Sequence, residues 1–275
     1  MMVKGILEGI YANLEKWMTP ENYRLCLGCM DLTTLNSTDS RNRVVSFTEK
    51  VNSFRESFPE YPCPAAICVY PNWGGTVKEN LKADGVKVAV VAGSFPSSQT
   101  FLQVKLMECR MAVEQGADEV DIVLALNSFM DGDYEGAAEE IREIKKAMGE
   151  KHLKVILETG ALKDEELIAK ASYLAMDAGA DFIKTSTGKQ EPAATPEAAV
   201  VMCLAIKEHY LATGQRVGFK PAGGISTAKD AITYLAIVDT VLGQEWLTPQ
   251  LFRIGASRLA NSLLEALENK RTIYY

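Results

Sequence analysis

Short runs of apolar residues recur along the chain, and they have the length of buried strands. Seven are well marked and an eighth is weaker: residues 25–30, 65–69, 86–91, 120–126, 154–157, 182–184, 217–220 and, last, 252–255. Between them, apolar residues recur every three or four positions, for example over residues 135–148 and 164–178, which predicts amphipathic helices. Strand and helix therefore alternate, which is typical of a parallel α/β sheet.

One joint between helix and strand occurs twice. Gly-Ala-Asp precedes predicted strands at residues 116–118 and 179–181, with each Gly where a helix would end in a left-handed cap. No Pro/Ser-rich linker divides the chain. We therefore predict that residues 1–275 form a single (β/α)8 TIM barrel, with a helical N-terminal extension over 1–20 and a C-terminal tail over 269–275. An open doubly wound sheet is the alternative.

Composition narrows the possible partners. The chain of 275 residues carries 29 Lys and Arg against 36 Asp and Glu, a formal net charge of −7 without a long basic run, so nucleic acid is not expected. No apolar run approaches the roughly 20 residues that span a bilayer, and we expect neither a signal peptide nor contact with a membrane. The 6 Cys are too dilute for a disulfide scaffold, which indicates the cytoplasm.

Candidate metal ligands are few. Cys26 and Cys29 have the spacing of a redox or metal pair, but in a strand over residues 25–30 they would point to opposite faces. We expect them to be buried strand cysteines. With only 2 His in the chain, a His-rich centre is excluded, and the sequence predicts no metal site.

Charged residues end several predicted strands. In a barrel, one face of each strand packs on the helices and the other points inside. The alternation puts Lys184, Lys220, Asp121 and Asp31 on the inward faces. A single such charge is more often solvated at the strand end or part of an internal ion pair. For two inward lysines together we favour a chemical role, because burying an ammonium is costly.

A lysine pair of this kind can make a Schiff-base nucleophile. Only the neutral amine attacks a carbonyl, and a second cation with partial desolvation lowers the amine's pKa. A neighbouring aspartate can carry the protons of carbinolamine formation and dehydration. The pattern does not decide which of Lys184 and Lys220 is the nucleophile.

Small-residue loops follow both lysines. Backbone N–H groups, hydroxyls and helix N-termini in such loops bind anions, and barrels often hold phosphate after their last two strands. Gly188 and Lys189 lack the rest of a nucleotide P-loop, so ATP or GTP is not expected. The prediction is a small phosphorylated substrate. The candidate binding residues are Thr187, Gly188, Lys189, Gly223, Gly224, Gly255 and Ser257.

Two of these segments, DFIKTSTGK at residues 181–189 and VGFKPAGG at 217–224, closely resemble the deoxyribose-phosphate aldolase family of class I aldolases. Further matches are MDLTTL at 30–35, CVYP at 68–71, EVD at 119–121 and GAS at 255–257, so the resemblance runs from about Asp31 to the C-terminus. It implies reversible cleavage of 2-deoxy-D-ribose 5-phosphate to D-glyceraldehyde 3-phosphate and acetaldehyde, without metal or organic cofactor. It also implies a place in deoxynucleoside breakdown and a homodimer as a possible assembly.

The resemblance also implies roles for single residues. Lys184 corresponds to the Schiff-base lysine, Lys220 to the residue that perturbs its pKa, and Asp121 to the group that transfers protons with Lys220. Asp31 corresponds to a residue that positions the polar network, and Cys68 to a cysteine near the active site, although a small apolar strand residue explains it equally well. The phosphate-site matches are Gly188, Lys189, Gly223, Gly224, Gly255 and Ser257.

Two positions depart from the family. Arg258 stands where a second serine is frequent, and Ser226 stands where an arginine is frequent. The exchange suggests a phosphate site whose cation has moved.

The tail ends in Tyr275, which resembles a C-terminal tyrosine that enters the active site in this family. A final helix over 257–268 would descend about 18 Å, and seven extended residues reach about 24 Å, enough to return to the catalytic mouth. A frayed tail, or one packed on a neighbouring subunit, is the alternative.

Two other functions fit a phosphate-binding barrel, namely an isomerase and a non-catalytic sugar-phosphate sensor. An isomerase gives no reason for two inward lysines. Borohydride trapping separates both functions from the aldolase, and isomerase assays separate them from each other.

Overall fold

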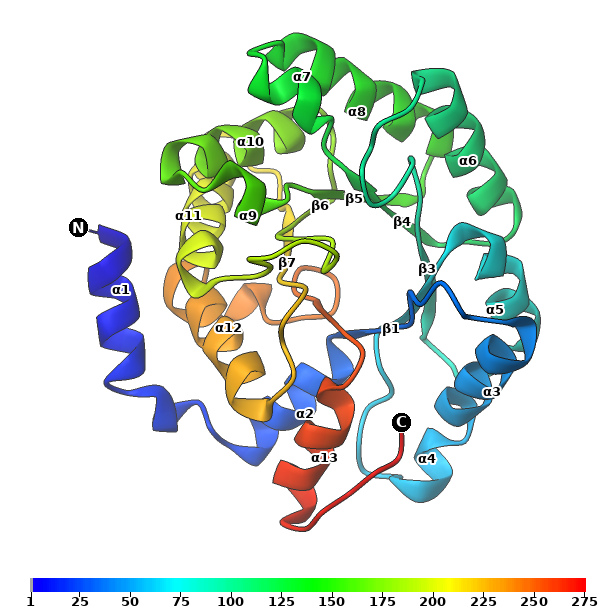
Figure 1. Ribbon diagram of the computed structural model, residues 1–275. Coiled ribbons are helices and arrows are strands. Elements are labelled where there is room, and N and C mark those ends of the chain that lie inside the picture. Colours follow the sequence, from blue (N-terminus) through cyan, green and yellow to red (C-terminus); the bar gives the residue numbers. More distant parts are fainter. Residues whose placement is uncertain (1) are drawn as a thin grey trace.

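The computed structural model describes residues 2–275 and shows eight parallel strands surrounded by helices (Figure 1). Each strand pairs with its neighbour in chain order, and β1 also pairs with β8. Parallel bridges from Phe219 to Phe252 and from Ala222 to Gly255 join the remaining edges and close the barrel. The strands are β1 Met30–Thr33, β2 Ala66–Val69, β3 Lys87–Val91, β4 Glu119–Val123, β5 His152–Ile156, β6 Phe182–Lys184, β7 Gly218–Lys220 and β8 Ile254–Ala256. The predicted (β/α)8 barrel is confirmed.

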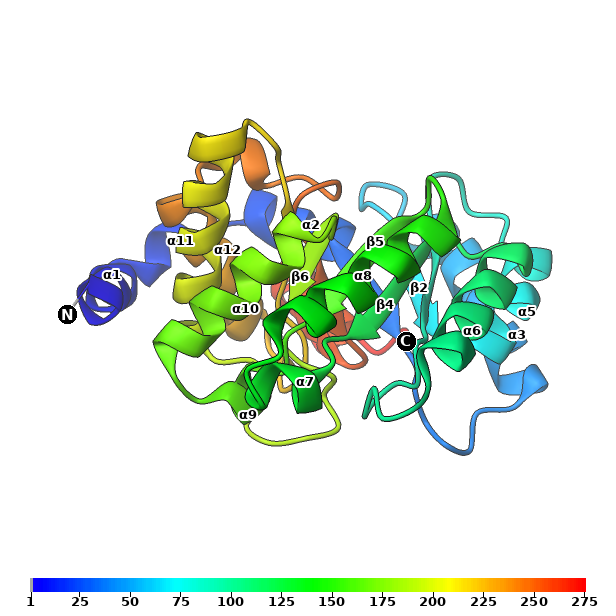
Figure 2. The same cartoon turned by 90° about the horizontal axis from the view of Figure 1, so that it is seen from above.

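Helices cover the outer surface of the barrel. They are α1 Met2–Tyr11, α2 Pro20–Gly28, α3 Arg41–Asn52, α4 Phe54–Ser57, α5 Gly74–Asn80, α6 Leu102–Glu114, α7 Leu126–Met130, α8 Tyr134–Met148, α9 Thr159–Leu162, α10 Glu165–Asp177, α11 Pro196–Thr213, α12 Ala228–Val241 and α13 Leu259–Glu268. Three short 3₁₀ helices complete the set: η1 Leu14–Lys16, η2 Pro71–Trp73 and η3 Gln244–Trp246. The N-terminal α1 lies at the outer edge of the molecule and packs on α11 and α12 (Figure 2). No helix within residues 2–275 has the length and apolarity needed to cross a membrane.

The repeated Gly-Ala-Asp joint has the same geometry at both places. Gly116 follows α6 with φ +97°, and Gly179 follows α10 with φ +100°, backbone angles that favour glycine. The aspartate then fastens the joint, because Asp118 accepts from the Val88 N–H at 3.0 Å and Asp181 from the Leu153 N–H at 2.7 Å. The predicted left-handed ends are confirmed.

One predicted strand is wrong. Residues 25–28 end the helix α2, and the strand β1 begins only at Met30. Pro20 stands in the first turn of α2, and the Thr19 side chain accepts from the Asn22 N–H at 3.3 Å, so a local start signal fixes a helix. A short apolar run cannot by itself be told from a buried helix segment.

The prediction that Cys26 and Cys29 are strand cysteines is therefore also wrong. Cys26 lies in α2 and Cys29 follows its last turn, so neither is a strand residue, although both are buried. Burial raises the pKa of the Cys29 thiol to about 12, which keeps it protonated and unreactive. Within residues 2–275 no group of three or more His, Cys, Asp or Glu has a metal-binding arrangement.

The barrel interior has an apolar part and a charged part. The side chains of Ala66, Cys68, Ala89 and Val91, from β2 and β3, form a small apolar cluster of their own. The strands β1 and β4 to β7, and the residue just before β8, contribute charged groups, and these form the site described next.

Candidate active site

The four charged residues predicted to face inward do meet inside the barrel. Lys184 and Lys220 end the neighbouring strands β6 and β7 and are register partners, so their side chains lie at the same level. Both ammonium groups contact the same oxygen of Asp121, with Oδ2 at 2.8 Å from Lys184 Nζ and 2.7 Å from Lys220 Nζ. Lys220 also forms an ion pair with Asp31 on β1. Asp121 therefore bridges the two lysines.

Two further cations lie below this group, and sequence reasoning missed both. Lys154 on β5 reaches Asp121 Oδ1 at 3.1 Å and Glu119 Oε2 at 2.5 Å. Arg253, just before β8, reaches Asp31 Oδ1 at 2.6 Å and Glu119 Oε1 at 2.7 Å. The sequence did contain a sign of both residues, because each occupies an inward position of a predicted strand. Lys154, however, is the first residue of the apolar run at 154–157, and Arg253 lies in the weakest run, at 252–255.

These side chains make up what we call the buried charge cluster. Its members are Asp31, Glu119, Asp121, Lys154, Lys184, Lys220 and Arg253, and all are buried. Four cations face three carboxylates, so the fully ionised cluster carries one surplus positive charge. A buried charge without a partner is costly, which favours the loss of one proton. Arginine cannot supply it, because its pKa is too high.

Lys184 is the cation best placed to lose that proton. Burial lowers the pKa of its ammonium and the adjacent Lys220 charge lowers it further, while Asp121 alone among the carboxylates contacts it and opposes the shift. Burial also disfavours the Lys220 ammonium, but Asp121 and Asp31 outweigh burial and raise its pKa. Lys154 contacts three carboxylates, and its pKa is likewise raised. The geometry thus distinguishes the two lysines that the sequence left equivalent.

A cavity of about 360 Å³ opens above Lys184, and the predicted phosphate loops line it. Gly223 has φ +88° and approaches Gly188 so closely that a Cβ on it would lie 3.0 Å from the Gly188 Cα, so this close approach of the loops after β6 and β7 requires glycine. The lining residues shared with the prediction are Thr187, Gly188, Lys189, Gly223, Gly224, Gly255 and Ser257, and Ser226 and Arg258 also line the cavity.

Two anchors hold the loop after β6. The buried Glu158 carboxylate accepts from the Thr187 N–H at 3.1 Å and from its hydroxyl at 2.6 Å. Across the mouth, Lys189 Nζ donates to the Leu35 carbonyl at 2.5 Å. Sequence reasoning missed Glu158, which sits in a left-handed conformation at φ +53° that periodicity does not indicate.

Cys68 belongs to the apolar side of the same interior. It lies on β2 in the cluster with Ala66, Ala89 and Val91, and it is buried. Burial raises the pKa of its thiol, so it stays neutral beside Lys184 and Lys220. Its contribution there is a small apolar surface next to the amines.

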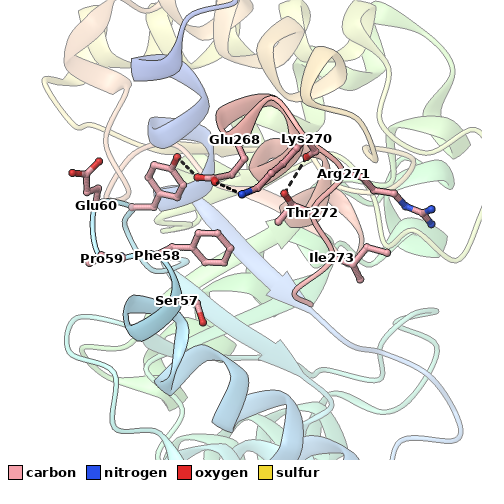
Figure 3. Close-up of a pocket in the computed structure, with 10 residues that line it drawn as sticks. Ser57, Phe58, Pro59, Glu60, Glu268, Lys270, Arg271, Thr272 and Ile273 are labelled. Atoms are coloured by element: carbon pink, nitrogen blue, oxygen red, sulfur yellow. Dashed lines mark hydrogen bonds and ion pairs between the residues drawn. The ribbon is translucent and has the colours of Figure 1, made fainter.

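Tyr275 is not brought together with these residues in this structure. The tail does run back along α13, where Asn261 Oδ1 accepts from the N–H groups of Tyr274 at 2.9 Å and Tyr275 at 3.0 Å. The Tyr275 ring, however, stacks on Phe54 with centroids 5.7 Å apart, and its hydroxyl is buried without a hydrogen-bond partner. The preceding tail residues line a separate cleft beside α4, shown in Figure 3.

Comparison with known proteins gives a consistent result. The model of the DeoC/LacD family of aldolases matches residues 26–257. The deoxyribose-phosphate aldolase of Homo sapiens is 43% identical over 256 residues, covering 90% of this chain and 79% of that protein. The deoxyribose-phosphate aldolase of Bos taurus is 44% identical over 241 residues, covering 84% and 76%. The solved structure of QR15, an aldolase, has 30% identity and a TM-score of 0.72, covering 89% of this chain and 96% of that one. The chain therefore belongs to the DeoC/LacD family of aldolases.

Proposed function

We propose that this chain is a deoxyribose-phosphate aldolase, which cleaves 2-deoxy-D-ribose 5-phosphate reversibly to D-glyceraldehyde 3-phosphate and acetaldehyde in deoxynucleoside breakdown. The observation that carries the proposal is the position of Lys184, the lysine best placed to be neutral, on the floor of a cavity lined by glycine-rich loops. The relatives of the same name support the choice of substrate. Incubation with the sugar phosphate should release both products in equal amounts, as followed by NMR. Absence of either product would contradict the proposal.

In the proposed reaction, the neutral Lys184 amine attacks the aldehyde carbon of the open-chain sugar and forms a carbinolamine. Loss of water gives an iminium ion, which draws electrons from the bond between C2 and C3. The C3 hydroxyl loses its proton, that bond breaks, and glyceraldehyde 3-phosphate leaves. The enamine left on Lys184 takes up a proton at C2, and water then releases acetaldehyde. Every step uses side chains and water alone.

The other residues of the cluster have supporting roles in this proposal. Asp121 shares one oxygen between Lys184 and Lys220, so it can pass a proton between the reacting amine and its neighbour. Asp31 holds Lys220 in place from the opposite side. Cys68 gives the reacting aldehyde a small apolar neighbour. The loop residues that we propose bind the phosphate and sugar hydroxyls are Thr187, Gly188, Lys189, Gly223, Gly224, Gly255 and Ser257.

The phosphate site gives the first prediction. We expect unphosphorylated 2-deoxy-D-ribose to have a kcat/KM lower by about 10²-fold or more, because binding at the remote phosphate orients the reacting carbon. Replacing Arg258 by Ala should lower kcat/KM for the phosphorylated sugar by about tenfold, the scale of one charge-assisted hydrogen bond. Steady-state kinetics of the wild type and of Arg258→Ala with both sugars measure these two effects. An equal effect of Arg258→Ala on the two sugars would show that Arg258 does not contact phosphate.

The tail gives the second prediction. We propose that Tyr275 leaves Phe54 and completes a proton relay at the enamine, since its phenol can both donate and accept. Tyr275→Phe should then slow exchange of the acetaldehyde methyl protons with solvent by about tenfold or more while leaving borohydride trapping at Lys184 intact. Asn261→Ala, which frees the tail from α13, serves as the comparison and should keep the exchange. Unchanged exchange in Tyr275→Phe would remove the tail from the mechanism.

We also propose a cytoplasmic homodimer. All six cysteines are free thiols, which persist in reducing compartments. On α6, Val104, Met107 and Met111 form an exposed apolar stripe beside a cavity of about 620 Å³. An antiparallel second copy of this helix would set Met107 against Met111 of its partner and cover the exposed stripe on both subunits.

The dimer gives the third prediction. Sedimentation of the chain should show a dimer, and Met107→Lys together with Met111→Lys should convert it to a monomer, since each new ammonium group would face another one across the interface. The same change at an exposed methionine outside the stripe, Met130→Lys on α7, is the control and should leave the dimer intact. A wild-type monomer, or a dimer that persists in the double variant, would contradict this interface.

A further inference from the structure

We propose that Arg253 is a positioning residue that sets the charge state of Lys184 from the far side of the buried charge cluster. Arg253 lies before β8 at the lower end of the barrel and is not among the residues that line the cavity. Its guanidinium contacts Asp31 and Glu119 and does not contact Lys184. The inference rests on the proposed function, because it concerns the lysine that would form the Schiff base.

The charges of the cluster alternate in layers from Arg253 to Lys184. Arg253 binds the carboxylates of Asp31 and Glu119, at 2.6 Å and 2.7 Å. The second oxygen of Asp31 faces Lys220. Glu119 Oε2, which Arg253 also contacts at 2.9 Å, faces Lys154. Each layer is thus fastened to the next by opposite charge.

The two routes then join at Asp121. Lys154 lies 3.1 Å from Asp121 Oδ1, and Lys220 lies 2.7 Å from Oδ2. Lys184 shares Oδ2 as the last layer, at 2.8 Å. Arg253 is therefore connected to Lys184 through two unbroken chains of ion pairs.

The six members of the buried charge cluster other than Lys184 have a net charge of zero only because Arg253 is one of them. With Arg253 in place, three cations balance three carboxylates, and a proton on Lys184 is surplus. Without it, the carboxylates would exceed the other cations by one, and the Lys184 ammonium would become the balancing charge. Coulomb interactions between buried groups extend over several ångströms, so a charge at the far layer is felt at the near one.

Of the other groups around Lys184, the charged residues Lys189, Glu191 and Arg258 line the same cavity but are exposed, so solvent screens their charges and none takes over this role. Asp121 from β4 and Lys220 from β7 are already counted, and Cys68 from β2 carries a neutral thiol. The strand β3 contributes Ala89 and Val91 to the interior, and Lys87 on the same face is exposed at the start of the strand. Among residues 2–275, the ion pairs within the barrel join only the seven members of the cluster.

The choice of arginine fits this role. A buried lysine can lose its proton when a neighbour changes, whereas a guanidinium stays protonated at every pH at which a protein is folded. Arg253 therefore fixes its own charge, and the only groups left to adjust are the lysines. Of these, Lys184 has the fewest carboxylate partners.

The test measures the pH at which Lys184 becomes reactive. Acetaldehyde and borohydride are added over a range of pH, and the rate of adduct formation at Lys184 is followed by peptide mass spectrometry. We expect Arg253→Met to raise the midpoint by about 0.5 to 1 pH unit, and Glu119→Gln to lower it by a similar amount. The double variant Arg253→Met with Glu119→Gln restores the original surplus, so its midpoint should return to within about 0.3 unit of wild type.

The outcomes separate the two proposals. Suppose that the adduct forms at Lys184 in every variant. Equal midpoints in the wild type and the variants, or a shift of the midpoint in the same direction in both single variants, would show that Arg253 is only structural. Absence of an adduct at Lys184 in the wild type would contradict the proposed function instead. Should Arg253→Met fail to fold, a double variant that keeps the lowered midpoint of Glu119→Gln would overturn the inference, and one that returns to the wild-type midpoint would support it.

Discussion

Lys184→Ala should lower kcat for sugar-phosphate cleavage by at least about 10⁴-fold, because the Schiff base can no longer form. Enzymes accelerate their reactions by about 10⁶-fold or more, and most of that acceleration would be lost here. The side chain touches only one carboxylate, and Asp121 keeps Lys154 and Lys220 as partners when Lys184 is removed. The variant should therefore fold, with a melting temperature within about 3 °C of wild type or above it, since a surplus buried cation contributes little stability.

Kinetics and thermal unfolding together check this expectation. Lys146→Ala is the matched control, because Lys146 is an exposed lysine on α8 whose side chain is 80% accessible. It should leave both quantities unchanged. Activity of Lys184→Ala within about 100-fold of wild type would show that another amine can replace Lys184, and would contradict its assignment as the nucleophile.

Lys220→Leu should lower kcat/KM by about 10² to 10³-fold and move the acidic limb of the pH–rate profile upward by at least about one unit. In the folded protein the Lys220 charge lowers the pKa of the Lys184 ammonium, and its removal lets Asp121 act on Lys184 without that opposition. The Lys184 pKa rises, so the neutral amine appears only at higher pH.

The charge-preserving variant Lys220→Arg distinguishes charge from shape. It should hold the acidic limb within about 0.5 unit of wild type even if its bulk reduces kcat. A limb that stays in place in Lys220→Leu, or that moves equally in both variants, would mean that Lys220 does not act through its charge.

The alternation of strand residues explains how much of the site was predictable. In β4, β6 and β7, clear apolar positions fix which face meets the helices, so Asp121, Lys184 and Lys220 could be assigned to the interior. The loops after β6 and β7 were predictable because glycine at a strand end has a local backbone meaning.

The misses have physical causes of the same kind. The run at residues 25–30 was assigned to a strand because a short run without polar positions shows no period, and the cap at Thr19 decides for a helix. Arg253 was overlooked because it lies in the weakest of the predicted strands, residues 252–255, where few apolar positions mark the face that points inside. The return of the tail along α13 follows from chain lengths, whereas the packing of Tyr275 on Phe54 depends on contacts between residues more than 200 positions apart.

The most direct test of the account is to trap the wild-type protein with acetaldehyde and borohydride and to map the modified peptide. Reduction of the iminium fixes an ethyl group on the reacting nitrogen, so the map identifies the amine that was neutral and accessible. The account predicts a single modified residue, Lys184, within the segment that follows Asp181. Modification at Lys220 alone, or no modification at either lysine, would contradict it.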